Sequence, residues 1–504
     1  MELVFQNKTS AFLQQILHET RSQEQTAELI VPDSFPDCAR IVSSCASAIL
    51  RGKECRQGSV TVTGAVRAGV LYVPEDESAP RALDAYVPFS LRIDHPSATE
   101  QMQSLLELRV RSVDARMIHS RKVLLRVNLG CELTCFAQTS ETFYTLTQPP
   151  AELQVKEQTY PILLPTETAE RSFVVDEQLE LPAGKPEIEH ICWYTAQPLV
   201  TERKLIGNKA VFKGLLAVKA LYQAADGSLN VFSQELPFSQ YCELEQDYEQ
   251  DALTLLPAVT GAELELLQDG QGRKLQLTVN LLVQALVQAL RPVELCEDAY
   301  VTRGTFEPEW KQYALACRLD AQQLHETLRE SFPAPVRAVI DSTLYLDFPE
   351  QSRTQTGVQV KAPCSVNIVY LDDDGAVQGL TGRAQTATEI ALSENGVCSA
   401  RVSVGRDGFA APGSGGTDVR YDLLFELECS AHQTLQSLCG GKLEPDAQRK
   451  ERRPSVIIRR TERAQSVWEL AKQYSTTVQA ISQANQLPGD QIERGEMLLI
   501  PIQL

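Results

Sequence analysis

The 504-residue sequence has little of what several protein classes require. Its six histidines form no HExxH or HxxxH pair, so we expect no helix-borne zinc site. It contains neither a GxSxG nucleophile elbow nor a GxxxxGK(S/T) phosphate loop. The 13 cysteines are odd in number and include no CxxC pair, which favours buried thiols in a reducing cytosol. We therefore expect no enzymatic activity, no cofactor and no metal.

Long apolar runs and excess positive charge are also missing. The first twenty residues lack a basic stretch followed by an unbroken apolar core, so a secretory signal is not expected. The most apolar segment, residues 277–290, is too short and too rich in amide side chains to span a bilayer. Lys and Arg total 47 against 66 Asp and Glu, and the net charge of −19 repels phosphate backbones. The sequence thus predicts a soluble cytoplasmic protein with no nucleic-acid partner and no membrane insertion.

A repeat of about 150 residues runs through the chain. A proline segment, VPDSFPDCARI at 31–41, reappears as LPAGKPEIEHI at 181–191. The alternating segment 58–73 reappears at 208–223 and, more weakly, at 356–371. Tandem copies at this period indicate whole domains rather than the units of a solenoid. The matching tyrosines are Tyr72, Tyr222 and Tyr370, and the matching glycines are Gly64 and Gly214, with Ala362 in the third copy.

Each copy has the pattern of an antiparallel β module, with two-residue alternation and polar turns. In every copy the tyrosine strand and the strand after it are predicted to form one hairpin. A longer hairpin follows. Between copies two and three, Glu309–Glu330 carries leucines at helical spacing, which predicts an amphipathic linking helix. The predicted hairpin strands are 105–113 with 123–133, 262–267 with 274–287, and 400–404 with 419–429, and the leucines are Leu315, Leu319, Leu324 and Leu328.

These patterns predict a mainly β protein with three tandem antiparallel modules, each a β-sandwich or barrel-like unit, followed by a small βααβ domain. The predicted units are an N-terminal segment with repeat 1 at 1–150, repeat 2 at 151–308, a linking helix with repeat 3 at 309–440, a basic linker at 441–453, and the βααβ domain at 454–504.

The C-terminal segment differs from the rest in charge. Residues 449–504 hold nine basic and six acidic residues, a net charge of +3, which leaves −22 for the remainder. The segment reads as a strand at 456–460, a helix from Val467 with Ser466 as its N-cap, a helix at 478–485 and a closing strand at 497–500. A basic domain on an acidic chain indicates a surface for an acidic partner.

Residues 466–501, SVWELAKQYSTTVQAISQANQLPGDQIERGEMLLIP, resemble a LysM domain over nearly its whole length. The resemblance implies that Trp468, Ile481 and Leu499 fill a core and that Gly495 turns the chain into the last strand. It also implies a groove that, in LysM domains, typically holds glycans containing N-acetylglucosamine. The corresponding groove residues are Arg463, Ala464, Gln465, Ser466, Val467, Asn485, Gln486, Leu487 and Ile492.

Two interpretations of this domain stay open. The Gly-Asp-Thr usual in the first LysM loop is replaced by Ala464-Gln465-Ser466, so the ligand is either a glycan or a protein. Arg459, Arg460 and Arg463 form either a solvated face or a docking surface for an acidic protein, with Trp468 as a further docking residue.

The whole layout, three β modules followed by LysM, resembles the SPOCS-domain proteins of spore-forming Firmicutes, among them clostridial spore coat morphogenesis proteins. The resemblance implies a non-enzymatic scaffold in spore coat assembly, located in the mother-cell cytosol at the forespore surface. Its implied partner is a coat morphogenetic ATPase or another coat protein, bound through the LysM domain. The alternative is a protein that binds peptidoglycan glycan of the cell wall or spore cortex.

Overall fold

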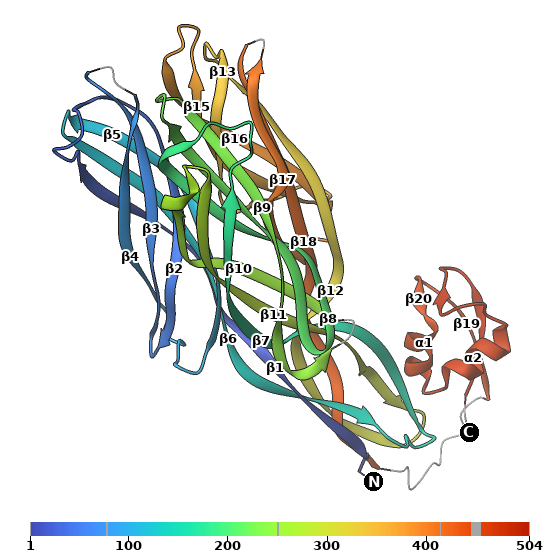
Figure 1. Cartoon of the computed structure of the whole chain (residues 1–504). Coiled ribbons are helices and arrows are strands. Elements are labelled where there is room, and N and C mark those ends of the chain that lie inside the picture. The colour runs from blue at the N-terminus through green and yellow to red at the C-terminus, as the bar shows by residue number, and fades with distance from the viewer. Residues whose placement is uncertain (1, 77–78, 249–250, 414, 445–454, 503–504) are drawn as a thin grey trace.

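The computed structural model describes residues 2–76, 79–248, 251–413, 415–444 and 455–502. The body, which ends at Glu444, consists of long antiparallel strands, and a small C-terminal module lies beside one end of it (Figure 1). Within the described residues, α-helices occur only in that small module. The prediction of a mainly β, antiparallel fold followed by a βααβ domain is therefore confirmed.

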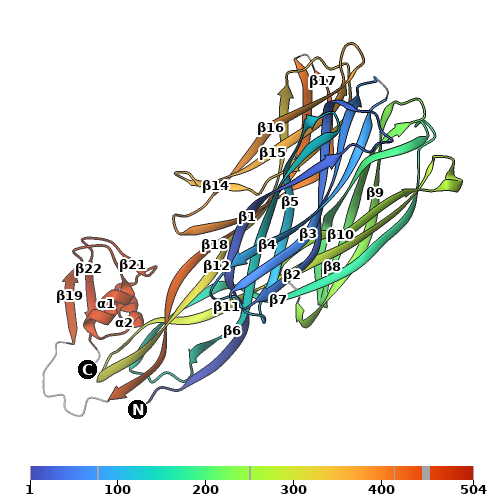
Figure 2. The same cartoon turned by 90° about the vertical axis from the view of Figure 1, so that its left-hand side faces the viewer.

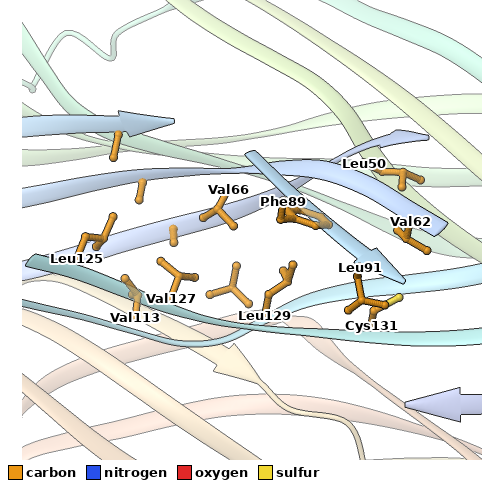
Figure 3. Close-up of a cluster of buried hydrophobic side chains, with 14 of the residues drawn as sticks. Leu50, Val62, Val66, Phe89, Leu91, Val113, Leu125, Val127, Leu129 and Cys131 are labelled. Carbon is orange, nitrogen blue, oxygen red and sulfur yellow. The ribbon is translucent and has the colours of Figure 1, made fainter. Parts of the chain in front are cut away.

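Module 1 is a sandwich of two three-stranded sheets, β2-β3-β4 and β1-β6-β5. Side chains alternate along each strand, so one side of each sheet is apolar and faces the other sheet. Val62 and Phe89 on one sheet lie in the same buried cluster as Leu125 and Leu129 on the other (Figure 3). The strands are β1 (Phe5–Ile30), β2 (Cys38–Arg56), β3 (Ser59–Pro74), β4 (Arg81–Asp94), β5 (Gln103–His119) and β6 (Lys122–Leu146).

Modules 2 and 3 repeat this strand order and have their own buried clusters. In module 2 a single long strand, β8, covers the counterparts of both β2 and β3. Module 2 consists of β7 (Leu153–Glu180), β8 (Ile188–Ala224), β9 (Leu229–Tyr248), β10 (Ala252–Leu266), a 3-10 turn (Gln268–Gly270) and β11 (Lys274–Val301). Module 3 consists of β12 (Thr305–Phe332), β13 (Ala338–Leu346), β14 (Glu350–Arg353), β15 (Gly357–Leu371), β16 (Val377–Ala391), β17 (Gly396–Gly413) and β18 (Gly416–Glu444).

The repeated proline and tyrosine segments are physically connected. The hydroxyl of Tyr72 donates a hydrogen bond to the carbonyl of Pro36 at 3.1 Å, and that of Tyr222 donates to Pro186 at 3.0 Å. Both tyrosines are fully buried, and a buried hydroxyl needs a partner. The proline turn and the tyrosine strand therefore recur together because each satisfies the other.

The repeated glycines lie beneath aromatic rings. Gly64 pairs with Phe89 across β3 and β4, and a Cβ atom at Gly64 would lie 2.5 Å from that ring and 2.3 Å from the Ile49 carbonyl oxygen. Gly214 in module 2 lies in the same way beneath Phe238. In module 3 the partner of Ala362 is Thr386, whose side chain carries no ring. The third copy can therefore carry alanine.

The predicted helix at Glu309–Glu330 is wrong, because these residues lie within strand β12, paired along its length with β18. Before Leu319 the buried positions are odd-numbered, including Leu315, and after it the inward positions are even-numbered, including Leu328. Leu319 is the extra residue of a β-bulge, and the bulge changes which residues face inward. Because the inward positions change from odd to even within one strand, the leucines have a spacing that resembles that of a helix.

Bulges recur at matching places in the first strand of every module. Ile16 in β1, Thr166 in β7 and Leu319 in β12 each lack a partner in the ladder. On the far side of these bulges the antiparallel strand pairs β1–β6, β7–β11 and β12–β18 converge into a narrow extension of the body, here called the stalk (Figure 2). The stalk comprises residues 5–16, 136–146, 153–166, 288–301, 305–319 and 430–444.

The three modules are not independent domains, because they share buried contacts. Leu71, Trp193 and Val369, one from each module, lie in one apolar cluster. The Lys219 ammonium of module 2 lies 2.7 Å from an Asp341 carboxylate oxygen of module 3, and Asp341 is buried. Several buried polar groups at this junction have a partner from another module, and these contacts fix how the modules are oriented. Other polar contacts at the junction are Gln284 with Leu106, Asn367 with Ser44, and Arg111 with Asp347.

Candidate functional site

The C-terminal module is the candidate binding site of the chain, and its helices begin where hydroxyl side chains cap them. The Ser466 hydroxyl accepts a hydrogen bond from the Glu469 amide at 3.1 Å, as the sequence predicts, and Thr477 caps the second helix in the same way. The elements are β19 (Val456–Arg460), β20 (Gln465–Ser466), α1 (Val467–Tyr474), α2 (Val478–Asn485), β21 (Gln491–Ile492) and β22 (Met497–Pro501).

The core of this module differs from the prediction at Leu499. Ile481 is fully buried as expected. Leu499, however, is 42% exposed, because Leu498 and Ile500 on either side of it point inward and a strand alternates its faces. Trp468 is half-buried, packs against the core and contacts the body with its indole nitrogen. The core is filled by Val467, Leu470, Ala471, Ile481, Ile492, Leu498 and Ile500.

The structure brings together the two loops predicted to form the groove. Strand β20 pairs with β21, and the Val467 amide donates to the Asp490 carbonyl at 2.7 Å. Ala464 and Gln486 are exposed at the surface of these loops. The exposed fractions of Gln465, Ser466, Asn485 and Leu487 are intermediate, whereas Val467 and Ile492 are buried and Arg463 is exposed.

Two of the predicted groove residues hold the fold together. The Asn485 side-chain amide donates to the carbonyls of Ile481 and Leu499, and its oxygen accepts from the Leu499 amide. Asn485 therefore ties α2 to β22. The Ser466 hydroxyl is occupied as the cap of α1. The groove assignment itself stays a prediction.

The arginines differ in what they contact. The Arg459 guanidinium donates to the Tyr474 hydroxyl at 2.5 Å and lies over its ring. Arg460 donates to the carbonyl of Gly495, which adopts a left-handed conformation (φ 96°) in the predicted turn. Arg463 is exposed. Two of the three guanidinium groups thus support the module while remaining at its surface.

A feature that the sequence reasoning missed is an apolar surface on the outer side of β19 and β22, here called the strand face. Val456 is 48% exposed, Ile458 66%, Met497 70% and Leu499 42%. Ile458 lies directly opposite Leu499 in the ladder, and Arg460 lies opposite Met497. The sequences of β19 (VIIRR) and β22 (MLLIP) could have predicted this surface, because their alternation places apolar residues on both sides of a two-stranded sheet.

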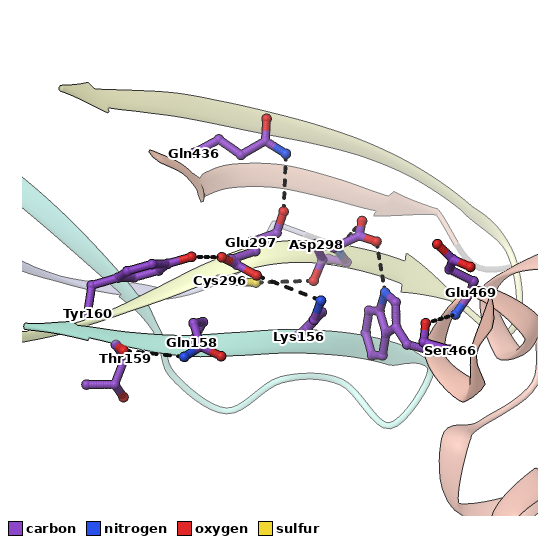
Figure 4. A network of polar contacts seen from close by, with 12 residues as sticks. Lys156, Gln158, Thr159, Tyr160, Cys296, Glu297, Asp298, Gln436, Ser466 and Glu469 are labelled. Atoms are coloured by element: carbon purple, nitrogen blue, oxygen red, sulfur yellow. Dashed lines mark hydrogen bonds and ion pairs between the residues drawn. The ribbon is translucent and has the colours of Figure 1, made fainter. Parts of the chain in front are cut away.

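The module also contacts the stalk. The Trp468 indole donates to an Asp298 carboxylate oxygen at 2.9 Å, and the Lys472 ammonium lies 2.6 Å from the other oxygen. Figure 4 shows the dashed line from Asp298 to the indole beside Ser466. The ring of Tyr300 meets that of Trp468 edge to face, with centroids 4.9 Å apart. Burial alone would raise the pKa of Asp298, but the hydrogen bonds from Lys472 and Trp468 outweigh it and hold this pKa below its ordinary value.

Other reactive groups are dispersed. Among the described residues, no group of three or more His, Cys, Asp or Glu side chains is placed to hold a metal ion. The 13 cysteines are free thiols, of which 11 are buried, in agreement with the interpretation as core residues. Burial raises the pKa of the Cys131 thiol to about 12, which leaves it protonated.

Neither helix in the described part of the chain is long and apolar enough to cross a membrane.

Comparison with known proteins identifies two families of domain. The family described as "SipL, SPOCS domain" matches residues 37–118 and 187–266, which contain β2–β5 of module 1 and β8–β10 of module 2. The LysM domain family matches residues 463–501. No curated protein and no solved structure matches the chain. This combination indicates a sporulation-related protein with a module of glycan-binding type.

Proposed function

Because the chain is a SPOCS-domain protein with a C-terminal LysM domain, we propose that it is a non-enzymatic scaffold in spore coat assembly. In this proposal the body supplies surface for contacts with coat proteins. The LysM domain anchors the chain to a coat morphogenetic ATPase at the forespore surface, in the mother-cell cytosol.

The observation that carries the proposal is the strand face. Four apolar side chains, among them Ile458 and Met497, are exposed together on a domain of fewer than fifty described residues. Contiguous exposed apolar surface rimmed by polar groups is typical of a protein–protein contact. The basic side chain of Arg460, opposite Met497 in the ladder, favours an acidic partner surface.

The body supports a scaffold in a different way. Its buried junction polar groups, such as Gln284 and Asp341, have partners in other modules, so the three modules present their surfaces in one fixed arrangement. A rigid scaffold of this kind binds several partners without an ordering cost.

The test is localisation and capture from sporulating cells with the full chain. Ile458→Glu and Leu499→Glu place carboxylates on the strand face, and we expect both to lose the ATPase from the co-purified material and to disperse a fluorescent fusion through the mother cell. Val174→Glu makes a similar change at a body residue that is 56% exposed, and serves as the matched control. Unchanged capture by both strand-face variants would contradict the proposal.

The second candidate function, peptidoglycan binding, is favoured by the pairing of β20 with β21, which joins the two predicted groove loops. It is tested by pelleting the full chain with purified peptidoglycan. Binding that Ile458→Glu leaves intact, while Gln486→Ala in the exposed loop weakens it, would favour the glycan over the protein partner.

A further inference from the structure

The end of β11 has a local irregularity at the foot of the stalk. Cys296 pairs with Glu157 and Asp298 pairs with Lys156, so Glu297 is an extra residue in the ladder. Such a bulge changes the direction in which the following side chains point. The residues after it, Asp298 and Tyr300, are those that contact the C-terminal module.

The module meets this segment with one side of α1. Trp468 and Lys472 are four residues apart and therefore lie on the same side of the helix. Their indole and ammonium groups donate to the two oxygens of the single Asp298 carboxylate. The carboxylate is thus held at both oxygens, and hydrogen bonds to a charged group are stronger than neutral ones.

Tyr300 adds an apolar contact to the polar one. Its side chain is 6% exposed and belongs to the same buried cluster as Val467, Leu470 and Ile481 of the module. Its hydroxyl donates to the Thr476 carbonyl at 2.8 Å, just beyond the end of α1. A ring from the stalk therefore completes the core of a small domain and has its polar atom satisfied.

We propose that the Asp298–Tyr300 segment is an internal ligand of the LysM α1 face, forming a latch that docks the module on the stalk. The latch contacts Trp468 and Lys472, and leaves the strand face and the exposed loop residues Ala464 and Gln486 outward. A protein that binds the α1 face must displace the latch and must itself present a carboxylate next to an aromatic ring. A partner on the strand face meets a module that is already oriented on the body.

This proposal extends the proposed function but is measured without any partner, so the two can fail separately. Trp193→Phe and Trp310→Phe leave Trp468 as the only tryptophan of the full chain. In this background we expect Asp298→Ala to shift Trp468 emission to longer wavelength and to increase its quenching by acrylamide. Small-angle X-ray scattering of the same variant should show a larger maximum dimension. Circular dichroism of each variant checks that the β body is intact.

Glu294→Gln provides the matched control, because Glu294 is an exposed carboxylate on the same strand and lies outside the contact. Asp298→Lys should open the latch, and adding Lys472→Asp should restore part of the emission shift by reversing the ion pair. Should the double tryptophan background unfold, scattering by Asp298→Ala and Glu294→Gln in the wild-type chain gives the comparison. Identical scattering and emission for Asp298→Ala and the unmodified chain would overturn the latch.

Discussion

The body and the C-terminal module place their apolar side chains differently. The body buries them in three sandwich cores and in a junction that all three modules share. The C-terminal module has one small core, takes Tyr300 from the stalk to complete it, and leaves the strand face exposed. Large cores stabilise a domain by themselves, whereas a small domain relies on contacts beyond itself. In the proposed function this difference corresponds to a supporting body and a module that makes the contacts.

The largest expected loss of stability follows from a substitution at the junction between the three modules of the body. Lys219→Met removes the partner of the buried Asp341 carboxylate, and an uncompensated buried charge costs about 3–5 kcal/mol in free energy of unfolding. Chemical denaturation of the full chain measures this loss. Lys213→Met is the control, because Lys213 pairs with Glu202 at the surface, where such a pair contributes about 0–1 kcal/mol. Equal losses from the two variants would contradict the rigid junction.

A smaller effect is expected beneath the rings of modules 1 and 2. Gly64→Ala and Gly214→Ala force a methyl group against Phe89 or Phe238 and a strand carbonyl, and overpacking of this kind costs about 1–3 kcal/mol. The midpoint of urea unfolding reports it. Gly184→Ala should leave the midpoint nearly unchanged, because its added Cβ meets no atom within 4 Å. A midpoint for Gly64→Ala equal to that of Gly184→Ala would argue against the packing described.

The latch should respond to pH in a defined direction. Because the folded-state pKa of Asp298 is lowered, its contribution to docking is present above the ordinary aspartate pKa and is lost as pH falls through the lowered one. The charged groups nearby are Lys472 on α1, with Lys156 and Glu297 on the stalk. Trp468 emission in the single-tryptophan chain should therefore stay constant from pH 8 to about pH 5 and shift only in stronger acid. In Asp298→Asn that acid-dependent shift should be absent, and its persistence would assign it to another group.

The smallest expected effect is a difference in reactivity between half-buried and fully buried cysteine thiols. A hydrogen bond from the Cys135 thiol, with help from Ser104 and Lys53, lowers the pKa of the half-buried Cys55 thiol. Burial raises the pKa of Cys439, the other half-buried thiol. At pH 7 iodoacetamide should therefore modify Cys55 first, as mass spectrometry of peptides would show. Faster modification of Cys439, or of a fully buried thiol such as Cys131, would contradict this order.

Much of the β body could be predicted because its signals are local. The hairpins around 105–133, 262–287 and 400–429 follow from two-residue alternation interrupted by turns, and all three occur as β5–β6, β10–β11 and β17–β18. The prediction of a linking helix was wrong because the bulge at Leu319 shifts the two-residue alternation in the middle of a strand. The repeat could have corrected the helix prediction, because the equivalent segments of the first two copies, which precede Pro32 and Pro182, are also strands.

The candidate site was predicted less completely. The helix cap at Ser466 and the turn at Gly495 are residue-specific backbone preferences, and both occur. Of the basic linker predicted at 441–453, residues 441–444 belong to β18, and residues 445–453 lie outside the described residues. The inward position assigned to Leu499 is wrong, because the resemblance matched the strand but its register decided which leucine faces the core.

By itself the sequence determined the repeat, the antiparallel β class and the LysM ending, because alternation, turn residues and caps act over a few residues. Only the tertiary structure decided that the modules share a buried junction, that three pairs of strands distant in sequence converge into a stalk, and that Asp298 and Tyr300 contact α1. Asp298 and Trp468 are separated by 170 residues, and no local pattern marks such a pair. Their contact depends on the bulge at Glu297, the register of β11 and the placement of a whole domain.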